Sequence, residues 1–157
     1  GLETLKGGRI KRIESHLDSN TNMLTYGDGM ADLDIGSLLE FHKSHGKPVT
    51  ITGVRPPSLF GEMIEDDGKV LSFEEKPQIS KGLINGGFIV FEREMMKYLS
   101  PDKNCDFEFG PLEEMVRSDK VMTYKHAGFW ECVDTVRDIA HLNKLWESGK
   151  ASWKVWN

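Results

Sequence analysis

The residue whose surroundings best suit metal chemistry is Asp28, which stands between Gly27 and Gly29 directly after the apolar run 23–26. In open α/β sheets, ligands gather beyond the carboxyl ends of the strands. A carboxylate there, with no side chains flanking it, can hold a hard cation such as Mg²⁺. The same three residues also suit a plain Gly-Asp-Gly turn with no function. The pattern alone therefore leaves two interpretations of Asp28, a metal ligand or part of a simple turn.

Asp134 is the second candidate carboxylate, and it comes just before a predicted helix over 135–147. One interpretation is that Asp134 caps this helix, as aspartates often do. However, Thr135 followed by Asp138 already fits the pattern of a capping box, with Asp in place of the usual Glu. This second interpretation leaves Asp134 outside the helix and available to bind a ligand.

Two further polar groups suit a phosphorylated sugar. Glu75 and Lys76 follow a predicted strand, and a carboxylate can accept hydrogen bonds from sugar hydroxyls while a lysine neutralises phosphate. Asn85, Gly86 and Gly87 offer a side-chain amide and open backbone. The alternatives are a solvated strand end for the first group and a β-bulge for the second.

Other kinds of site find no support in the spacing of the residues. The sequence has no Walker loop, no Ser/His/Asp or Cys/His arrangement, and no histidines at metal-ligand spacing. We interpret Cys105 and Cys132 as two reduced thiols of a cytoplasmic protein, since neither their number nor their spacing suggests a zinc site.

The elements that must position these residues alternate between helices and apolar strands, which favours an α/β class with a mixed, mostly parallel sheet flanked by helices. Helical spacing of Ile10, Ile13 and Leu17 predicts an opening helix just after Gly7-Gly8. Capping and breaker residues predict a second helix that begins after Asp34 and stops at Gly46. The remaining predicted elements are strands near 23–26, 49–54, 61–64, 70–74, 83–91 and 121–124, and helices at 111–117 and 135–147.

Length and charge narrow the class of protein further. A chain of 157 residues predicts a single domain over 1–157 with one sizeable core. The net charge of −5 argues against a nucleic-acid partner or an anionic membrane surface. No apolar run is long enough to span a membrane, and the polar first residues predict no signal peptide.

The order of the motifs along the chain resembles that of the sugar-1-phosphate nucleotidylyltransferases. Residues 41–47 and the ending 145–156 are similar to the glucose-1-phosphate cytidylyltransferases among them. The resemblance covers about residues 7 to 156 and implies a nucleotide-diphospho-sugar transferase fold. The segments that carry it are 26–29, 60–61, 74–77, 85–88 and 129–135.

This resemblance implies roles for individual residues. Asp28 and Asp134 resemble the two aspartates that bind Mg²⁺ in the family. The implied reaction is attack by a sugar-1-phosphate oxygen on the α-phosphorus of a nucleoside triphosphate, with release of pyrophosphate. The implied ligands of glucose 1-phosphate, or a similar sugar phosphate, are Gly61, Glu75, Lys76, Asn85 and Gly86.

The chain departs from the family pattern in one respect, because nothing in it matches the Gly-rich, cationic loop that grips the triphosphate near the family's N-terminus. We therefore expect the C-terminal part of such a domain, with nucleoside triphosphate binding in doubt and catalysis incomplete in this chain alone. The alternative is a non-catalytic remnant that binds sugar phosphate or oligomerises. An uncovered strand edge would favour a homo-oligomer.

Overall fold

The computed structural model describes residues 2–56, 61–74 and 82–156. They divide into two compact units, each assembled from three separate stretches of the chain. The prediction of one domain over 1–157 stays a prediction. The first unit comprises Gly1–Tyr26, Asp34–Thr52 and Gly87–Tyr124, and the second comprises Gly27–Leu33, Gly53–Gly86 and Lys125–Asn157.

The largest sheet has four strands in the order β1-β6-β3-β7. β1 runs antiparallel to β6, with Thr21 opposite Glu92. β3 and β7 run parallel. At one end Val49 N–H donates to the Lys120 carbonyl, and at the other end His126 N–H donates to the Gly53 carbonyl, so residue numbers rise in the same direction along both strands. The predicted mixed sheet is confirmed. The strand bounds are β1 Thr21–Leu24, β3 Val49–Val54, β6 Ile84–Glu92 and β7 Val121–Lys125.

The main core of the first unit lies between this sheet and the helices α1 (Lys6–Arg12) and α3 (Glu113–Arg117). Ile89 and Phe91 are two residues apart on β6, so their side chains point to the same face of the sheet, and both are buried in this core. The 3₁₀ helix Arg93–Tyr98 adds Met95 and Met96 to this core, and a second 3₁₀ helix covers Glu14–His16. The buried residues of the cluster are Ile10, Val49, Ile89, Phe91, Met95, Met96, Leu99, Phe107 and Met115.

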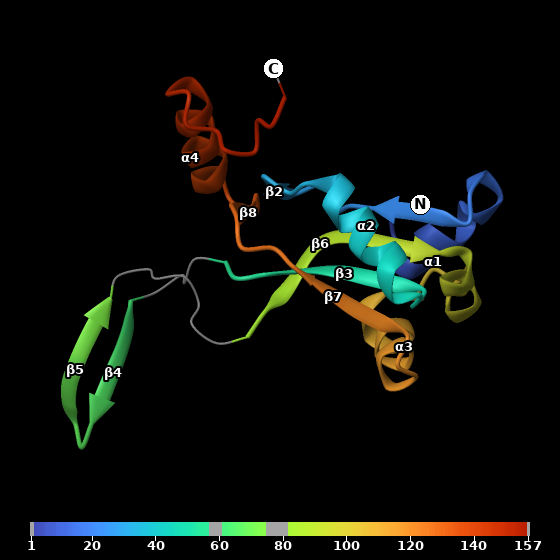
Figure 1. The fold of residues 1–157 in the computed structure, drawn as a ribbon, viewed down its shortest axis with the longest axis horizontal. Helices are drawn as coiled ribbons and strands as arrows, with labels where there is room; N and C mark the ends of the chain where they lie inside the picture. The colour runs from blue at the N-terminus through green and yellow to red at the C-terminus, as the bar shows by residue number, and fades with distance from the viewer. Residues whose placement is uncertain (1, 57–60, 75–81, 157) are drawn as a thin grey trace. The chain divides into compact units, whose positions relative to one another are not determined.

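Helix α2 (Ile35–His45) crosses the sheet over β3 and β6 (Figure 1), where His42 reaches Thr50 and Glu92. The predicted ends of this helix are confirmed. The Asp34 side chain accepts from Ser37 N–H at the start, and Gly46 takes the left-handed conformation at the end.

Gly7 and Gly8 correct one sequence expectation, because they lie inside α1 rather than ahead of it. A Cβ atom on Gly8 would stand 2.3 Å from the Asp102 carbonyl oxygen, and one on Gly7 would stand 2.8 Å from that of Asp106. Gly8 N–H also donates to the Cys105 carbonyl. The helix accepts two poor helix formers because the loop 102–106 approaches its backbone closely.

The second unit contains two small antiparallel pairs and one long helix. The hairpin of β4 (Glu62–Asp66) and β5 (Lys69–Glu74) turns at Asp67 and Gly68, both at positive φ, as the Asp-Asp-Gly sequence predicts. The short ribbon of β2 (Gly29–Ala31) and β8 (Trp130–Cys132) was not predicted. Helix α4 runs over Val136–Glu147.

The helix predicted over 111–117 is a regular α-helix, α3, only from Glu113. Pro111 and Leu112 belong to a preceding π-helical segment, Glu108–Leu112, in which Phe109 and Gly110 have non-helical backbone angles. No helix among the described residues combines the length and apolar character required to cross a bilayer.

Candidate metal and substrate site

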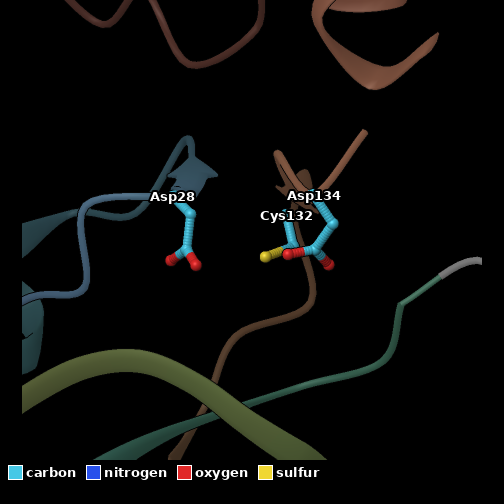
Figure 2. Close-up of side chains that lie close together, drawn as sticks. All are labelled: Asp28, Cys132 and Asp134. Carbon is cyan, nitrogen blue, oxygen red and sulfur yellow. The ribbon is translucent and has the colours of Figure 1, made fainter. Parts of the chain in front are cut away.

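Three potential metal ligands come together in the second unit (Figure 2). The carboxylates of Asp28 and Asp134 and the thiol of Cys132 each offer one donor atom, and the three atoms lie within 4.8 Å of one another. The two aspartates are exposed and the cysteine is half-buried. The structure therefore unites the two aspartates that the sequence singled out and adds a sulfur to them.

The β2–β8 ribbon is what brings these residues together. Gly29 stands opposite Cys132 in the ribbon. Just beyond this pair, Val133 N–H donates to the Asp28 carbonyl at 2.8 Å. The backbone on both sides of the cluster is therefore fixed by the same ladder, although Asp28 and Asp134 lie far apart in the sequence.

The capping box of α4 holds Asp134 in place from the other side. The Thr135 side chain accepts from Asp138 N–H, and the Asp138 carboxylate accepts from the backbone N–H groups of both Thr135 and Asp134. This confirms the interpretation that Thr135, rather than Asp134, caps the helix. The Asp134 carboxylate is consequently left to face Cys132 and Asp28.

The thiol of Cys132 responds to these surroundings. Burial raises the pKa of this thiol, and a hydrogen bond to Asp134 and the negative charges of Asp28 and Asp134 raise it further, to about 11. Without a cation nearby, the cysteine is a neutral thiol that donates to a carboxylate. Cys105, in the first unit, shows a different environment, with Sγ near Ser100 N–H and the Asp106 carbonyl.

The donor set suits a divalent cation. Two carboxylates are the ligands that Mg²⁺ or Mn²⁺ prefers, with water completing the coordination shell. No other group of three such side chains occurs in residues 2–56, 61–74 and 82–156. Asp28 and Asp134 are therefore the residues that would hold a hard cation here.

Of the residues predicted to bind a sugar phosphate, those that the structure describes also belong to the second unit. Gly61 directly precedes β4, while Asn85 and Gly86 lie at the start of β6. Glu75 and Lys76 lie outside the described residues. The Gly86 carbonyl accepts a hydrogen bond of 2.9 Å from the indole N–H of Trp130, which begins β8. This bond ties the predicted sugar-phosphate strand to the ribbon that carries Cys132.

Two residues of this site were missed by sequence reasoning. Cys132 was interpreted as an ordinary thiol, although its place two residues before Asp134 puts both side chains on one side of an extended segment. Trp130 lies inside the segment 129–135 that carries the family resemblance, but nothing in the sequence indicates the Gly86 carbonyl as its partner.

Comparison with curated proteins gives two informative relatives. The chain is 41% identical over 157 residues to glucose-1-phosphate cytidylyltransferase from Salmonella typhi, covering 99% of this chain and 61% of that protein. It is 34% identical over 128 residues to the catalytic subunit beta of mannose-1-phosphate guanylyltransferase from Dictyostelium discoideum, covering 75% of this chain and 35% of that protein. The chain thus spans less than two thirds of the length of either relative.

Solved structures agree in fold. HddC from Yersinia pseudotuberculosis matches with a TM-score of 0.63 at 18% identity, covering 90% of this chain and 62% of that one. The inositol-1-phosphate CTP transferase from T. maritima matches with a TM-score of 0.65 at 13% identity, covering 98% of this chain and 64% of that one. The fold predicted by resemblance, that of the nucleotide-diphospho-sugar transferases, is confirmed.

The family described as "Nucleotidyl transferase" matches residues 9–149, which is most of the chain. That match agrees with the relatives, with the fold and with the convergence of Asp28 and Asp134 on one ribbon. This chain belongs to the nucleotidyl transferase family.

Proposed function

We propose that this chain takes part in transferring a cytidylyl group from CTP to glucose 1-phosphate, giving a nucleotide sugar and pyrophosphate. The observation that carries the proposal is the convergence of Asp28 and Asp134 on the β2–β8 ribbon. Cytidine and glucose follow the Salmonella typhi relative, whereas the Dictyostelium discoideum relative is named for mannose 1-phosphate and a guanylyl group. The identity of the nucleotide base and of the sugar is accordingly the part of the proposal that must be tested by comparing substrates.

In this proposal Asp28 and Asp134 hold Mg²⁺. When bound, that ion supplies positive charge against the phosphate oxygens, which repel one another and the incoming nucleophile. The new bond joins a sugar-phosphate oxygen to the α-phosphorus. The broken bond releases pyrophosphate, which takes the bonding electron pair. The protein needs to position the reactants, and a ribbon that holds both aspartates together suits that task.

We assign the sugar phosphate to the strand starts of the second unit. Gly61, Asn85 and Gly86 offer backbone groups and an amide, and we propose that Glu75 and Lys76 complete the set with a carboxylate and a cation. The hydrogen bond from Trp130 to the Gly86 carbonyl supports this assignment, since it fixes one predicted sugar ligand to the ribbon of the predicted metal ligands.

The Gly-rich triphosphate loop has no counterpart within these 157 residues, and the chain spans 61% of the Salmonella typhi relative. We therefore expect this chain by itself to bind glucose 1-phosphate and a divalent cation, and to fall short of complete turnover. Backbone N–H groups that wrap a triphosphate cannot be replaced by scattered surface lysines.

The first test is a pyrophosphate-release assay with CTP, glucose 1-phosphate and Mg²⁺, paired with calorimetric titration of glucose 1-phosphate. Asp28→Asn removes a proposed cation ligand, and Asp18→Asn removes the same charge from an exposed carboxylate outside the site. We expect cation-dependent glucose 1-phosphate binding in the wild type and in Asp18→Asn, and its loss in Asp28→Asn. Absence of binding in all three chains would contradict the proposal and favour a remnant without a ligand.

We also propose that the chain forms a homo-oligomer. β1 is an edge strand of the sheet, and Met23 on it is 46% exposed. Exposed strand edges invite pairing with another chain. Beside β1 lies an apolar hollow lined by Met23, Leu24, Thr25, Ile35, Leu38, Phe88 and Ile89. Sedimentation equilibrium at micromolar concentration tests this, and a monomer would contradict it.

A further inference from the structure

We propose that Cys132 is a third ligand of the cation site, so that the site exchanges Mg²⁺ for a thiophilic divalent cation such as Zn²⁺ or Cd²⁺. The inference rests on the proposed function in taking Asp28 and Asp134 as the cation ligands. It goes further in assigning a metal preference to the Cys132 side chain.

The first support is proximity. The Cys132 sulfur and one oxygen each of Asp28 and Asp134 lie within 4.8 Å of one another. A Zn²⁺ ion with bonds of about 2.0 to 2.3 Å holds its ligand atoms roughly 3.5 Å apart. Closing the site therefore requires the exposed carboxylates to rotate towards the sulfur. In Figure 2 the sulfur and the two carboxylates face a common space.

The second support is the backbone around the sulfur. Cys132 is the last residue of β8, and its cross-strand partner is Gly29. Gly29 has no side chain, so the residue directly opposite Cys132 does not cover the sulfur. Cys132 and Asp134 lie two residues apart on an extended segment, which directs both side chains to the same side.

The third support is the chemistry of the donors. Mg²⁺ binds oxygen and leaves a thiol uncoordinated, whereas sulfur favours softer cations. A set of two carboxylates and one sulfur gives three protein ligands, and three is the number at which zinc sites keep an open fourth position. When the sulfur coordinates, its proton passes to solvent and the sulfur binds as thiolate.

The consequence is competition between two kinds of cation at one site. Bound to Asp28 and Asp134 alone, Mg²⁺ retains several water molecules that phosphate oxygens can replace. A thiophilic cation that also binds Cys132 gains a third bond and resists displacement by Mg²⁺. The structure thus assigns to Cys132 the control of which metal occupies the site.

Absorption spectroscopy with Cd²⁺ and Co²⁺ tests this on the full 157-residue chain. A metal–thiolate bond produces a charge-transfer band that carboxylate ligation does not. We expect one equivalent of Cd²⁺ to produce the band in the wild type and in Cys105→Ala, and none in Cys132→Ala. Cd²⁺ affinity in Cys132→Ala should fall by at least the ~10-fold that loss of even an outer partner of a metal ligand costs.

Cys132→Ser keeps the size of the side chain and serves as a second variant. It should also lose the band while keeping the circular dichroism of the wild type. Equal Cd²⁺ affinity in the wild type and Cys132→Ala would overturn the inference, as would a band that survives in Cys132→Ala and disappears in Cys105→Ala.

The outcomes for the two proposals can be told apart. If the proposed function fails, glucose 1-phosphate does not bind to any chain, yet the thiolate band and its dependence on Cys132 are unaffected. If this inference fails, Mg²⁺-dependent glucose 1-phosphate binding persists and Cys132→Ala leaves cation affinities unchanged.

Discussion

The hydroxyl oxygen of Thr50 lies 2.8 Å from Nδ1 of His42, and both side chains are buried between α2 and β3. A second histidine, His45, reaches the same hydroxyl through Nε2, while its Nδ1 accepts from Lys47 N–H. Since Nδ1 of His45 accepts, its Nε2–H must donate to Thr50. The Thr50 hydroxyl then donates to His42, and Nε2–H of His42 donates to Glu92 at 3.1 Å. The end of α2 is thus joined to β3 and β6 by a directed chain of donors.

Thr50→Val tests the centre of this chain, because valine keeps the shape and removes the hydroxyl. His42 and His45 would each lose a partner, and a buried polar group without one costs about 1 to 3 kcal/mol. We expect that loss in the free energy of unfolding by urea. Thr50→Ser retains the hydroxyl and should lose much less, and equal losses in the two variants would refute the role of the hydrogen bonds.

The pH dependence of stability tests the neutral state of His45. Burial lowers the pKa of His45 below its ordinary value, and the positive charge of Lys47 lowers it further. The unfolded chain therefore binds a proton more readily than the folded one. The contribution of His45 to stability is complete above a pH of about 6.5 and is lost as the pH falls towards the lowered pKa.

Urea midpoints measured from pH 8 to pH 5 for the wild type and His45→Gln provide the comparison. The difference between the two curves isolates His45 from the other titrating groups. We expect the wild type to lose stability faster below pH 6.5. Parallel curves would show that His45 titrates alike in both states.

Gly87→Ala tests the backbone at β6. Gly87 has a φ of +82°, and a Cβ atom there would lie 2.8 Å from Cδ2 of Tyr26. The variant combines an unfavourable backbone conformation with a clash, so we expect a loss of about 1 to 3 kcal/mol in the free energy of unfolding. Gly27→Ala is the matched control, because a Cβ atom there meets nothing within 4 Å. Equal stability of the two variants would contradict the structural reason for a glycine at position 87.

Thr135→Ala tests whether the α4 cap positions a cation ligand. Loss of the capping side chain should cost about 1 kcal/mol of stability. Because Asp138 holds the backbone N–H groups of both Thr135 and Asp134, a frayed cap should also weaken Mn²⁺ binding, measured by calorimetry. Thr135→Ser keeps the hydroxyl and should restore both quantities. Lower stability with unchanged Mn²⁺ affinity would show that the cap stabilises α4 without positioning a cation ligand.

Much of the fold could be predicted because the signals are local. The ends of α2 are set by Asp34 and Gly46, which act on their own neighbours in sequence. β3 was predicted with its observed bounds, Val49–Val54, from its β-branched residues and the flanking prolines. The hairpin of β4 and β5 follows from the turn at Asp67 and Gly68.

The ribbon that builds the site could not be predicted, because β2 and β8 have three residues each and pair across most of the chain. Strands that short carry no readable periodicity. The role proposed for Cys132 depends on the same pairing, so the sequence could not indicate it. Gly7 and Gly8 were misplaced because their position in α1 depends on the loop 102–106, a contact that no local pattern records.

The pairing of β2 with β8 also fixes when the site can exist during synthesis. Asp28 leaves the ribosome well before its partners Cys132 and Asp134, which follow much later in the sequence. Closing so long a loop carries an entropic cost that a nascent chain cannot offset until β8 has emerged to pair with β2. The proposed cation site can therefore form only after these two distant segments have met, and metal uptake would report on the pairing of β2 with β8.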